Sequence, residues 1–242
     1  MHIYAATFNK APDPNRIHGA IMPCTAKKLE GVRHEFHKHT EFVLTTQEII
    51  RMIKEVGIDY PNIPCEEVDS KWGQSTAAAL IFGVSGGVME AALRYALFAL
   101  KQNTEENYRL IAESGIRGLP IVDAKAGALI DGIKTAKLSF GGTELSVAVV
   151  SGLANASAII NRIKEGEHFD FVEVMACPGG CIGGGGQPKA AWDLKEKRAQ
   201  GIYRAADAMP LKSSEQNPVI KEWRELMGSE KAEHEHWHIH YK

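Results

Sequence analysis

The sequence has no strong net charge, no long apolar run and few cysteines. Its 28 Lys and Arg residues nearly balance 30 Asp and Glu residues, which gives a formal net charge of -2. The basic residues are scattered, so the chain lacks the positive field that attracts a polynucleotide, and we expect no nucleic-acid partner. No apolar run approaches the roughly 20 residues that a membrane helix needs, and we expect no membrane span.

The N-terminal residues and the overall composition favour a globular cytoplasmic protein. Residues 1–4 carry neither the basic nor the apolar region of a secretory signal, so we expect a cytoplasmic location. The chain is 44% hydrophobic and 24% charged over 242 residues, which is enough for a sizeable core and argues against disorder.

Two of the four cysteines lie in a glycine-rich segment. Cys177 and Cys181 enclose Pro178-Gly179-Gly180, and four glycines follow at 183–186. Such a backbone can wrap closely around a bulky inorganic group and donate amide hydrogen bonds to it. The pattern favours iron–sulfur ligation. A zinc site, a redox disulfide, a pair of inert thiols and a phosphate-binding loop are the alternatives, and the loop lacks the Lys-Ser/Thr ending of a P-loop.

The other two cysteines differ in setting. Cys24 is followed within one turn by Lys27, whose charge would stabilise a thiolate or an anionic ligand of a metal. We therefore expect Cys24 to join Cys177 and Cys181 as a third ligand of one redox site. Cys65 precedes two glutamates in an acidic loop, and we interpret it as a bystander.

Hydrophobic periodicity and capping residues predict mixed α/β structure. Thr45-Thr46-Gln47-Glu48 is typical of a capping box, which predicts a helix ending at Gly57. Residues 29–42 are polar and are expected to form a surface connection. Residues 171–176 alternate and predict a strand that delivers Cys177 at its C-terminal end. Further elements are predicted as a helix over 88–100, a hairpin of 137–140 with 145–150, and a helix over 154–163.

Several segments resemble a known family. Residues 22–28 (MPCTAKK) and 171–188 closely resemble the second and third signature motifs of the iron-only (FeFe) hydrogenases. The similarity spans nearly the whole chain and extends to residues 43–48, 82–94, 117–119, 152–156, 213–218 and 238–241.

The resemblance implies a fold, a cofactor and an activity. The fold would be α/β, with mixed sheets flanked by helices: residues 1–188 as a partial cluster-binding catalytic domain, and residues 189–242 as an extended C-terminal segment like a hydrogenase small subunit. The cofactor, or H-cluster, would be a four-iron four-sulfur cubane joined to a two-iron unit with CO, cyanide and a bridging dithiolate. The reaction would be reversible reduction of protons to dihydrogen with ferredoxin-like electron carriers, in anaerobic hydrogen metabolism.

The matching positions imply roles for seven residues. Cys24 and Cys177 would bind the cubane, and Cys181 would bridge the cubane to the two-iron unit. Lys27 would hydrogen-bond a cyanide. Three apolar side chains would line the two-iron pocket: Met22, Met175 and Phe82.

The chain also departs from the family pattern. The first signature motif, with two adjacent cysteines, is not found among these residues, so one cubane thiolate and a proton-relaying cysteine are missing. We expect a partner chain or segment to supply this motif, and maturation enzymes to install the cofactor. A related iron–sulfur assembly factor, or an inactive or sensory hydrogenase relic, is the alternative.

Two groups of histidines are expected to be solvated surface rather than metal sites. One comprises His34, His37 and His39. The other comprises His234, His236, His238 and His240. Both are interleaved with charged residues, which favours that interpretation.

Overall fold

The computed structural model describes residues 17–33, 35, 40–67, 73–122 and 129–229. The chain divides into two compact units, and each is described by itself. The first comprises 1–73, 185–188 and 218–242, and the second comprises 74–184 and 189–217. No helix within the described ranges is both long enough and apolar enough to cross a bilayer.

The first unit is built around a parallel strand pair. β1 (Gly19–Met22) pairs with β2 (Phe42–Thr45), and α2 (Ala26–Val32) lies between them in sequence. α3 (Thr46–Val56) follows β2 directly, and the short helix η2 (Tyr60–Asn62) comes next. α9 (Pro218–Met227) belongs to the same unit. The expectation of a surface connection over 29–42 is therefore wrong for its first residues, which are helical.

α3 confirms the predicted capping box. The Thr45 hydroxyl accepts a hydrogen bond from the Glu48 amide at 3.3 Å, and the Glu48 carboxylate accepts one from the Thr45 amide at 2.7 Å. Gly57 ends the helix at φ 75°, a left-handed conformation that glycine adopts without strain.

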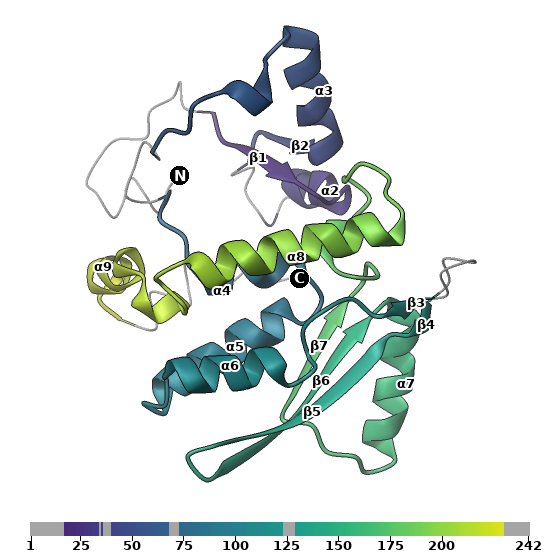
Figure 1. Ribbon diagram of the computed structural model, residues 1–242, viewed down its shortest axis with the longest axis vertical. Coiled ribbons are helices and arrows are strands. Elements are labelled where there is room, and N and C mark those ends of the chain that lie inside the picture. The colour runs from purple at the N-terminus through teal and green to yellow at the C-terminus, as the bar shows by residue number, and fades with distance from the viewer. Residues whose placement is uncertain (1–16, 34, 36–39, 68–72, 123–128, 230–242) are drawn as a thin grey trace. The chain divides into compact units, whose positions relative to one another are not determined.

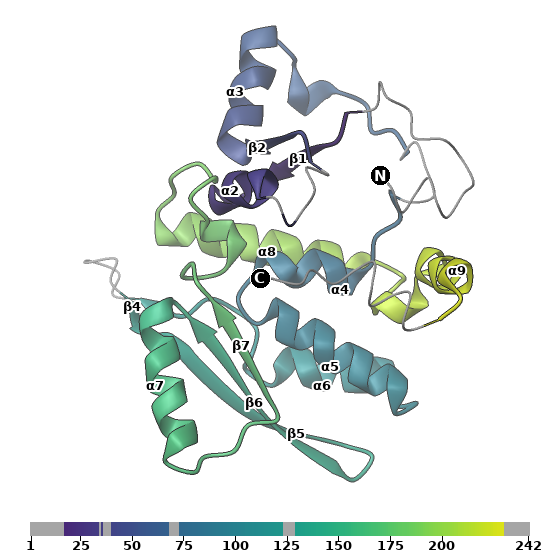
Figure 2. The ribbon, with the colours of Figure 1, turned by 180° about the vertical axis from the view of Figure 1, so that it is seen from behind.

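The second unit contains a three-stranded sheet covered on both faces. The strands are β5 (Ile133–Phe140), β6 (Thr143–Ser151) and β7 (Phe171–Met175), in the order β5-β6-β7. β5 and β6 form the predicted hairpin. β6 and β7 are parallel and connected through α7 (Leu153–Lys164). Figures 1 and 2 show α7 on one face of this sheet and α5 and α6 on the other.

Alternation along β6 explains the two layers. Val147 and Val149 face the core cluster formed with α5 (Gly87–Ala99) and α6 (Glu105–Glu113). Ala148 and Val150 pack with Ile159 of α7 instead. Because successive side chains of a strand point to opposite faces, one β-branched run serves both layers.

Three short elements of the second unit, α4 (Ala77–Leu80), η4 (Ile81–Gly83) and the 3-10 helix η5 (Cys181–Gly183), contact α8 (Trp192–Ala208). α4 and η4 pack on α8 through small and aliphatic side chains. The short strands β3 (Ile121–Val122) and β4 (Leu129–Asp131) pair with each other. The short 3-10 helix η6 (Ser214–Gln216) completes the unit.

Candidate functional site

Cys177 and Cys181 lie on one tight turn after β7. The strand ends at Met175, and Cys177 follows as predicted. The Cys177 carbonyl accepts a hydrogen bond from the Gly180 amide at 2.9 Å, and the Cys181 carbonyl accepts one from Gly184 at 2.9 Å. Both thiols are half-buried, and no disulfide joins any of the four cysteines, all of which are described.

Two glycines let this turn pack closely against the chain that precedes α5. Gly179 and Gly180 have φ values of 88° and 91°, which favour glycine. The Gly179 amide donates to the Ser151 hydroxyl at 2.9 Å, and its carbonyl accepts from the Ser85 amide at 3.1 Å. A Cβ at Gly180 would lie 2.7 Å from the Ser85 nitrogen, so a side chain would displace the turn.

The residue after Cys181 is anchored in the core. Ile182 is buried with Val84 and Ala199, and partly buried Leu119 packs on the same cluster. The Ile182 carbonyl also accepts a hydrogen bond from the Arg198 guanidinium at 3.1 Å. The position of Cys181 therefore depends on apolar packing beneath the loop and not on the glycines alone.

A buried carboxyl group connects β7 to the start of α5. Glu173 is 7% exposed and accepts hydrogen bonds from the amides of Gly86 at 2.6 Å and Met89 at 2.7 Å. Burial raises the pKa of Glu173, and the bonds from these amides oppose that rise. Sequence reasoning missed this residue, although a charge inside an apolar strand is a signal that a buried partner exists.

A second buried network lies under the 117–119 segment. Glu90 is fully buried and accepts from Arg94 at 2.6 Å and from Arg117 at 2.7 Å. Desolvation lowers the pKa of Arg117, but the carboxylates of Glu90 and Asp207 outweigh it and leave that pKa raised. The Gly118 amide donates to the Tyr203 hydroxyl at 2.9 Å. The network fixes the backbone that leads to Leu119.

Cys24 lies in the first unit, directly after β1. Its neighbour Pro23 accepts a hydrogen bond through its carbonyl from the Gly186 amide at 3.0 Å, and the Gly186 carbonyl accepts from the Gln47 amide at 3.0 Å. A Cβ at Gly186 would lie 2.9 Å from the Cys24 nitrogen. The end of the glycine run is thus held against the backbone that carries Cys24.

Met22 and Lys27 lie together in the first unit. Both line a small cavity of about 210 Å³, with Glu30 on the same wall. The Lys27 ammonium donates to the Glu30 carboxylate at 2.7 Å, and both side chains are partly exposed. An ammonium has three donor hydrogens, so Lys27 keeps donors for another anion while bound to Glu30.

The other predicted residues are distributed as follows. Met175 is half-buried at the end of β7, and Phe82 is 48% exposed in η4. Cys65 is exposed. Within either unit, as far as it is described, no group of three His, Cys, Asp or Glu side chains is arranged around a metal position. Both groups of histidines lie outside the described residues.

The two units supply different parts of the predicted ligand set. Cys177 and Cys181 are brought together by one turn, whereas Cys24 belongs to the other unit. Cys24 and Cys177 each follow the carboxyl end of a parallel strand, β1 and β7. In open α/β sheets, ligands bind outside the carboxyl ends of strands, so both cysteines occupy positions typical of binding residues.

Two family models match the sequence. The model described as iron only hydrogenase large subunit, C-terminal domain, matches residues 1–185. The model described as iron hydrogenase small subunit matches residues 193–242.

Individual relatives are similar over most of this chain. The NADP-reducing hydrogenase subunit HndD of Solidesulfovibrio fructosivorans is 38% identical over 98% of this chain and 40% of its own length. The periplasmic Fe hydrogenase large subunit of Nitratidesulfovibrio vulgaris is 42% identical over 73% of this chain and 40% of its own. The chain thus spans about 40% of the length of these curated relatives. Cytosolic iron-sulfur assembly component 3 of Bos taurus is also similar, at 28% identity over 90% of this chain and 46% of its own.

Solved structures share the fold. The apo FeFe-hydrogenase HydA1 variant from Chlamydomonas reinhardtii is similar with a TM-score of 0.68 and 29% sequence identity. The match covers 99% of this chain and 66% of that one. The remaining part of the solved chain has no counterpart in these 242 residues.

Proposed function

Because this chain belongs to the family of the iron-only hydrogenase large subunit, C-terminal domain, we propose that it is the cluster-binding catalytic part of an FeFe hydrogenase. The reaction is the reversible reduction of protons to dihydrogen, with electrons exchanged through ferredoxin-type carriers. The proposal rests above all on the turn that holds Cys177 and Cys181, two half-buried thiols that no disulfide joins.

The residues of this turn suit a bulky iron–sulfur group. Thiolates are the usual ligands of iron–sulfur clusters, and backbone amides beside them tune the reduction potential. Glycines at 183–185 add no side-chain bulk next to Cys181. In this proposal Cys177 would hold a four-iron four-sulfur cubane, and Cys181 would hold both the cubane and a two-iron unit with CO, cyanide and a bridging dithiolate.

Cys24 completes the three thiolates that this chain offers. The backbone next to Cys24 is held by the hydrogen bond from the Gly186 amide to the Pro23 carbonyl, within the first unit. Gly186 lies in the same glycine run that begins after Cys181. Chain connectivity therefore limits how far the Cys24 backbone can be from Cys181, since each residue spans at most about 3.6 Å. We infer that Cys24 is the second cubane ligand from this chain.

The surrounding side chains would orient and shield the cofactor. Lys27 would donate a hydrogen bond to an anionic cyanide, because a cationic donor stabilises an anion. Met22 shares the Lys27 cavity, and Met175 and Phe82 supply apolar surface that excludes water. When bound, the two-iron unit supplies the proton-reduction chemistry, and the protein positions and tunes it.

Three thiolates leave the cubane one ligand short. We infer that a further chain or segment carries the first cysteine motif, and that maturation enzymes install the two-iron unit. Residues 1–188 would form the partial cluster-binding domain and 189–242 a segment like the hydrogenase small subunit. We place the protein in the cytoplasm and in anaerobic hydrogen metabolism.

The similarity to iron–sulfur assembly factors defines the second candidate. Such a protein would bind a cubane but no two-iron unit, and an inactive or sensory hydrogenase relic would bind a cluster without turnover. Residues 25–27, 117–119 and 238–241 favour the enzyme. Higher identity to the hydrogenase subunits than to the assembly component points the same way.

Infrared spectroscopy tests the assignment. The chain is co-expressed with a polypeptide bearing the first cysteine motif and with the maturation enzymes, and bands of bound CO and cyanide are recorded. We expect these bands in the wild type and their loss in Cys181→Ala, because the bridging thiolate is removed. Cys65→Ala is the matched control, since Cys65 is exposed, and it should keep the bands.

Two results would count against the proposal. Unchanged bands in Cys181→Ala would show that this cysteine does not hold the two-iron unit. A cubane signal without CO or cyanide bands in the wild type would favour the assembly factor. We also expect the cluster-loaded chain to evolve no hydrogen alone, because its ligand set is incomplete.

A further inference from the structure

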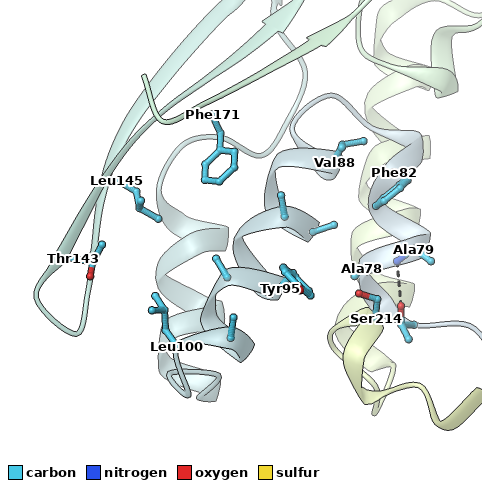
Figure 3. Close-up of a pocket in the computed structure, with 15 residues that line it drawn as sticks. Ala78, Ala79, Phe82, Val88, Tyr95, Leu100, Thr143, Leu145, Phe171 and Ser214 are labelled. Carbon is cyan, nitrogen blue, oxygen red and sulfur yellow. Dashed lines mark hydrogen bonds between the residues drawn. The ribbon is translucent and has the colours of Figure 1, made fainter. Parts of the chain in front are cut away.

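β7 and the cysteine turn that follows it have two kinds of surroundings. β7 begins at Phe171, which lines the apolar cavity of about 720 Å³ shown in Figure 3. This cavity lies within the second unit, and none of its lining residues is charged. The turn that carries Cys177 and Cys181 is instead approached by charged side chains of α8, in the same unit.

The first two turns of α8 pack against the glycines of the cysteine turn. A Cβ added at Gly179 would lie 3.7 Å from the ring of Trp192. A Cβ added at Gly183 would lie 3.3 Å from the ammonium nitrogen of Lys195. Gly183 is the second residue after Cys181, so a positive charge lies beside the backbone that leads away from this thiol.

Arg198 adds a second positive charge on the same face of α8. It lies three residues after Lys195, which is the spacing of neighbours on one helix face. Its guanidinium donates a hydrogen bond to the carbonyl of Ile182 at 3.1 Å, and Ile182 is the residue next to Cys181. Both cationic side chains are half-buried, and water screens a partly buried charge less than an exposed one.

The position of Lys195 is unfavourable for α8 itself. Lys195 is the fourth residue of this helix, and the N-terminal end of a helix carries the positive end of its dipole, which disfavours a cation. Among the described residues, no carboxylate forms an ion pair with Lys195. Its ammonium lies 4.8 Å from the centroid of the Trp192 ring, which helps to fix its position. A fixed cation without an anionic partner, beside a turn of thiols, indicates that an anionic group binds at this turn.

We propose that Lys195 and Arg198 raise the reduction potential of the iron–sulfur cluster that Cys177 and Cys181 would hold; this inference rests on the proposed function. Each thiolate ligand brings one negative charge, and the uptake of one electron adds another. Net charge is among the factors that set the reduction potential of such clusters. A nearby cation stabilises the more negative, reduced state more than the oxidised state, so it favours reduction. Neither residue is a ligand in this proposal, and both act through their charge.

A redox titration of the bound cubane tests this role. The chain is co-expressed with the polypeptide that bears the first cysteine motif but without the maturation enzymes, so that the complex holds the cubane alone. Dithionite supplies the electron, and electron paramagnetic resonance measures the reduced fraction at fixed potentials. We expect Lys195→Met, which removes the charge and keeps an unbranched side chain, to lower the ratio of reduced to oxidised cubane at least about threefold at the wild-type midpoint.

Three further variants separate charge from packing. Lys195→Arg keeps the positive charge and should give the ratio of the wild type. Lys197→Met removes the same charge from an exposed position on the opposite side of α8, where solvent screens it, and it should also leave the ratio unchanged. Arg198→Gln keeps a hydrogen-bond donor near the Ile182 carbonyl but loses the charge, and it should lower the ratio in the same direction as Lys195→Met. Circular dichroism checks the fold of each variant.

The results separate this inference from the proposed function. Equal ratios in Lys195→Met and the wild type would overturn the inference, and so would an equal fall in Lys197→Met or a fall in Lys195→Arg. None of these results changes the expected CO and cyanide bands of the matured complex. Conversely, a cubane without those bands in the matured complex would count against the proposed function alone, since the effect of Lys195→Met is measured on the cubane.

Discussion

At the scale of single residues, Glu173 connects the strand before the cysteine turn to the start of α5. Glu173 lies on β7, and its carboxyl group accepts hydrogen bonds from two backbone amides at the N-terminal end of α5. Amides at a helix start have no partner within the helix, and a negative charge there is stabilised by the helix dipole. The side chain thus fixes β7, the strand that leads to Cys177, to the start of α5.

Replacing Glu173 by Gln should destabilise the second unit. The amide oxygen of Gln can accept from one of the two backbone amides, whereas its NH₂ group cannot accept from the other. A buried donor left without an acceptor costs about 1–3 kcal/mol, measurable by urea unfolding. The control Glu165→Gln changes an exposed glutamate and should have no comparable effect, and equal stability of both variants would contradict the role of Glu173.

The same substitution should alter the pH dependence of stability. Burial raises the pKa of Glu173 above its ordinary value of 4.5, so the folded state holds its proton more tightly than the unfolded state. The contribution to stability is then complete below pH 4.5 and decreases as pH rises through the raised pKa. Glu173→Gln should lack this decrease when unfolding is measured across that range.

The sequence predicted where Cys177 lies relative to a strand, but it did not predict which residues hold the backbone around it. Cys177 follows a strand, as the alternation of 171–176 predicts, because local pattern determines where a strand ends. Ser151 and Glu173 act through contacts distant in sequence, with Gly179 and with Gly86 and Met89. No spacing rule links such residues, so their roles required the structure.

At the scale of elements, α3 was predicted with both of its ends, whereas α2 was not predicted as a helix. α3 has a capping box at its start and glycine at its end, and both are confirmed. α2 has no side-chain capping bond and no buried residue. Its sequence therefore resembles a surface connection, and its helical form depends on packing beside β2.

Removal of the α3 cap should affect that helix alone. Thr45→Ala leaves the Glu48 amide without its acceptor, and loss of an N-cap costs about 0.5–2 kcal/mol. Faster amide exchange is expected over residues 46–56. Thr135→Ala, which changes an exposed strand residue, should leave that exchange unchanged.

Acid should weaken the same cap. Bonding to the Thr45 amide, together with Lys28, lowers the pKa of Glu48 from 4.5 to about 2. The contribution of Glu48 is therefore present above pH 4.5 and is lost as pH falls through about 2. The measured quantity is the protection of the α3 amides relative to their intrinsic exchange rates. Protection that stays constant over this pH interval would contradict the role of Glu48.

At the scale of the whole molecule, apolar burial is very unequal between the two units. The hydrophobic clusters found among the described residues lie in the second unit. Among the described residues of the first unit, the buried side chains are Thr45 and Val219. A two-stranded sheet with so few buried side chains is marginal in water, so we expect the described part of the first unit to open more readily than the second unit.

This inequality predicts how cluster binding changes protease resistance. In the cluster-free chain, cleavage should begin in the first unit, around the exposed loop at 58–67, while the second unit persists. If Cys24 is a ligand as proposed, cluster loading should protect the first unit, because binding to the folded state alone stabilises that state.

Variants at the cysteines show whether the cluster itself is responsible. Cys24→Ser should abolish protection of the first unit on cluster loading, whereas Cys65→Ser should retain it, because Cys65 is exposed and assigned no ligand role. Digestion followed by mass spectrometry measures both. Equal protection in Cys24→Ser and the wild type would mean that the first unit is stabilised without a bond from Cys24, and would remove this cysteine from the proposed ligand set.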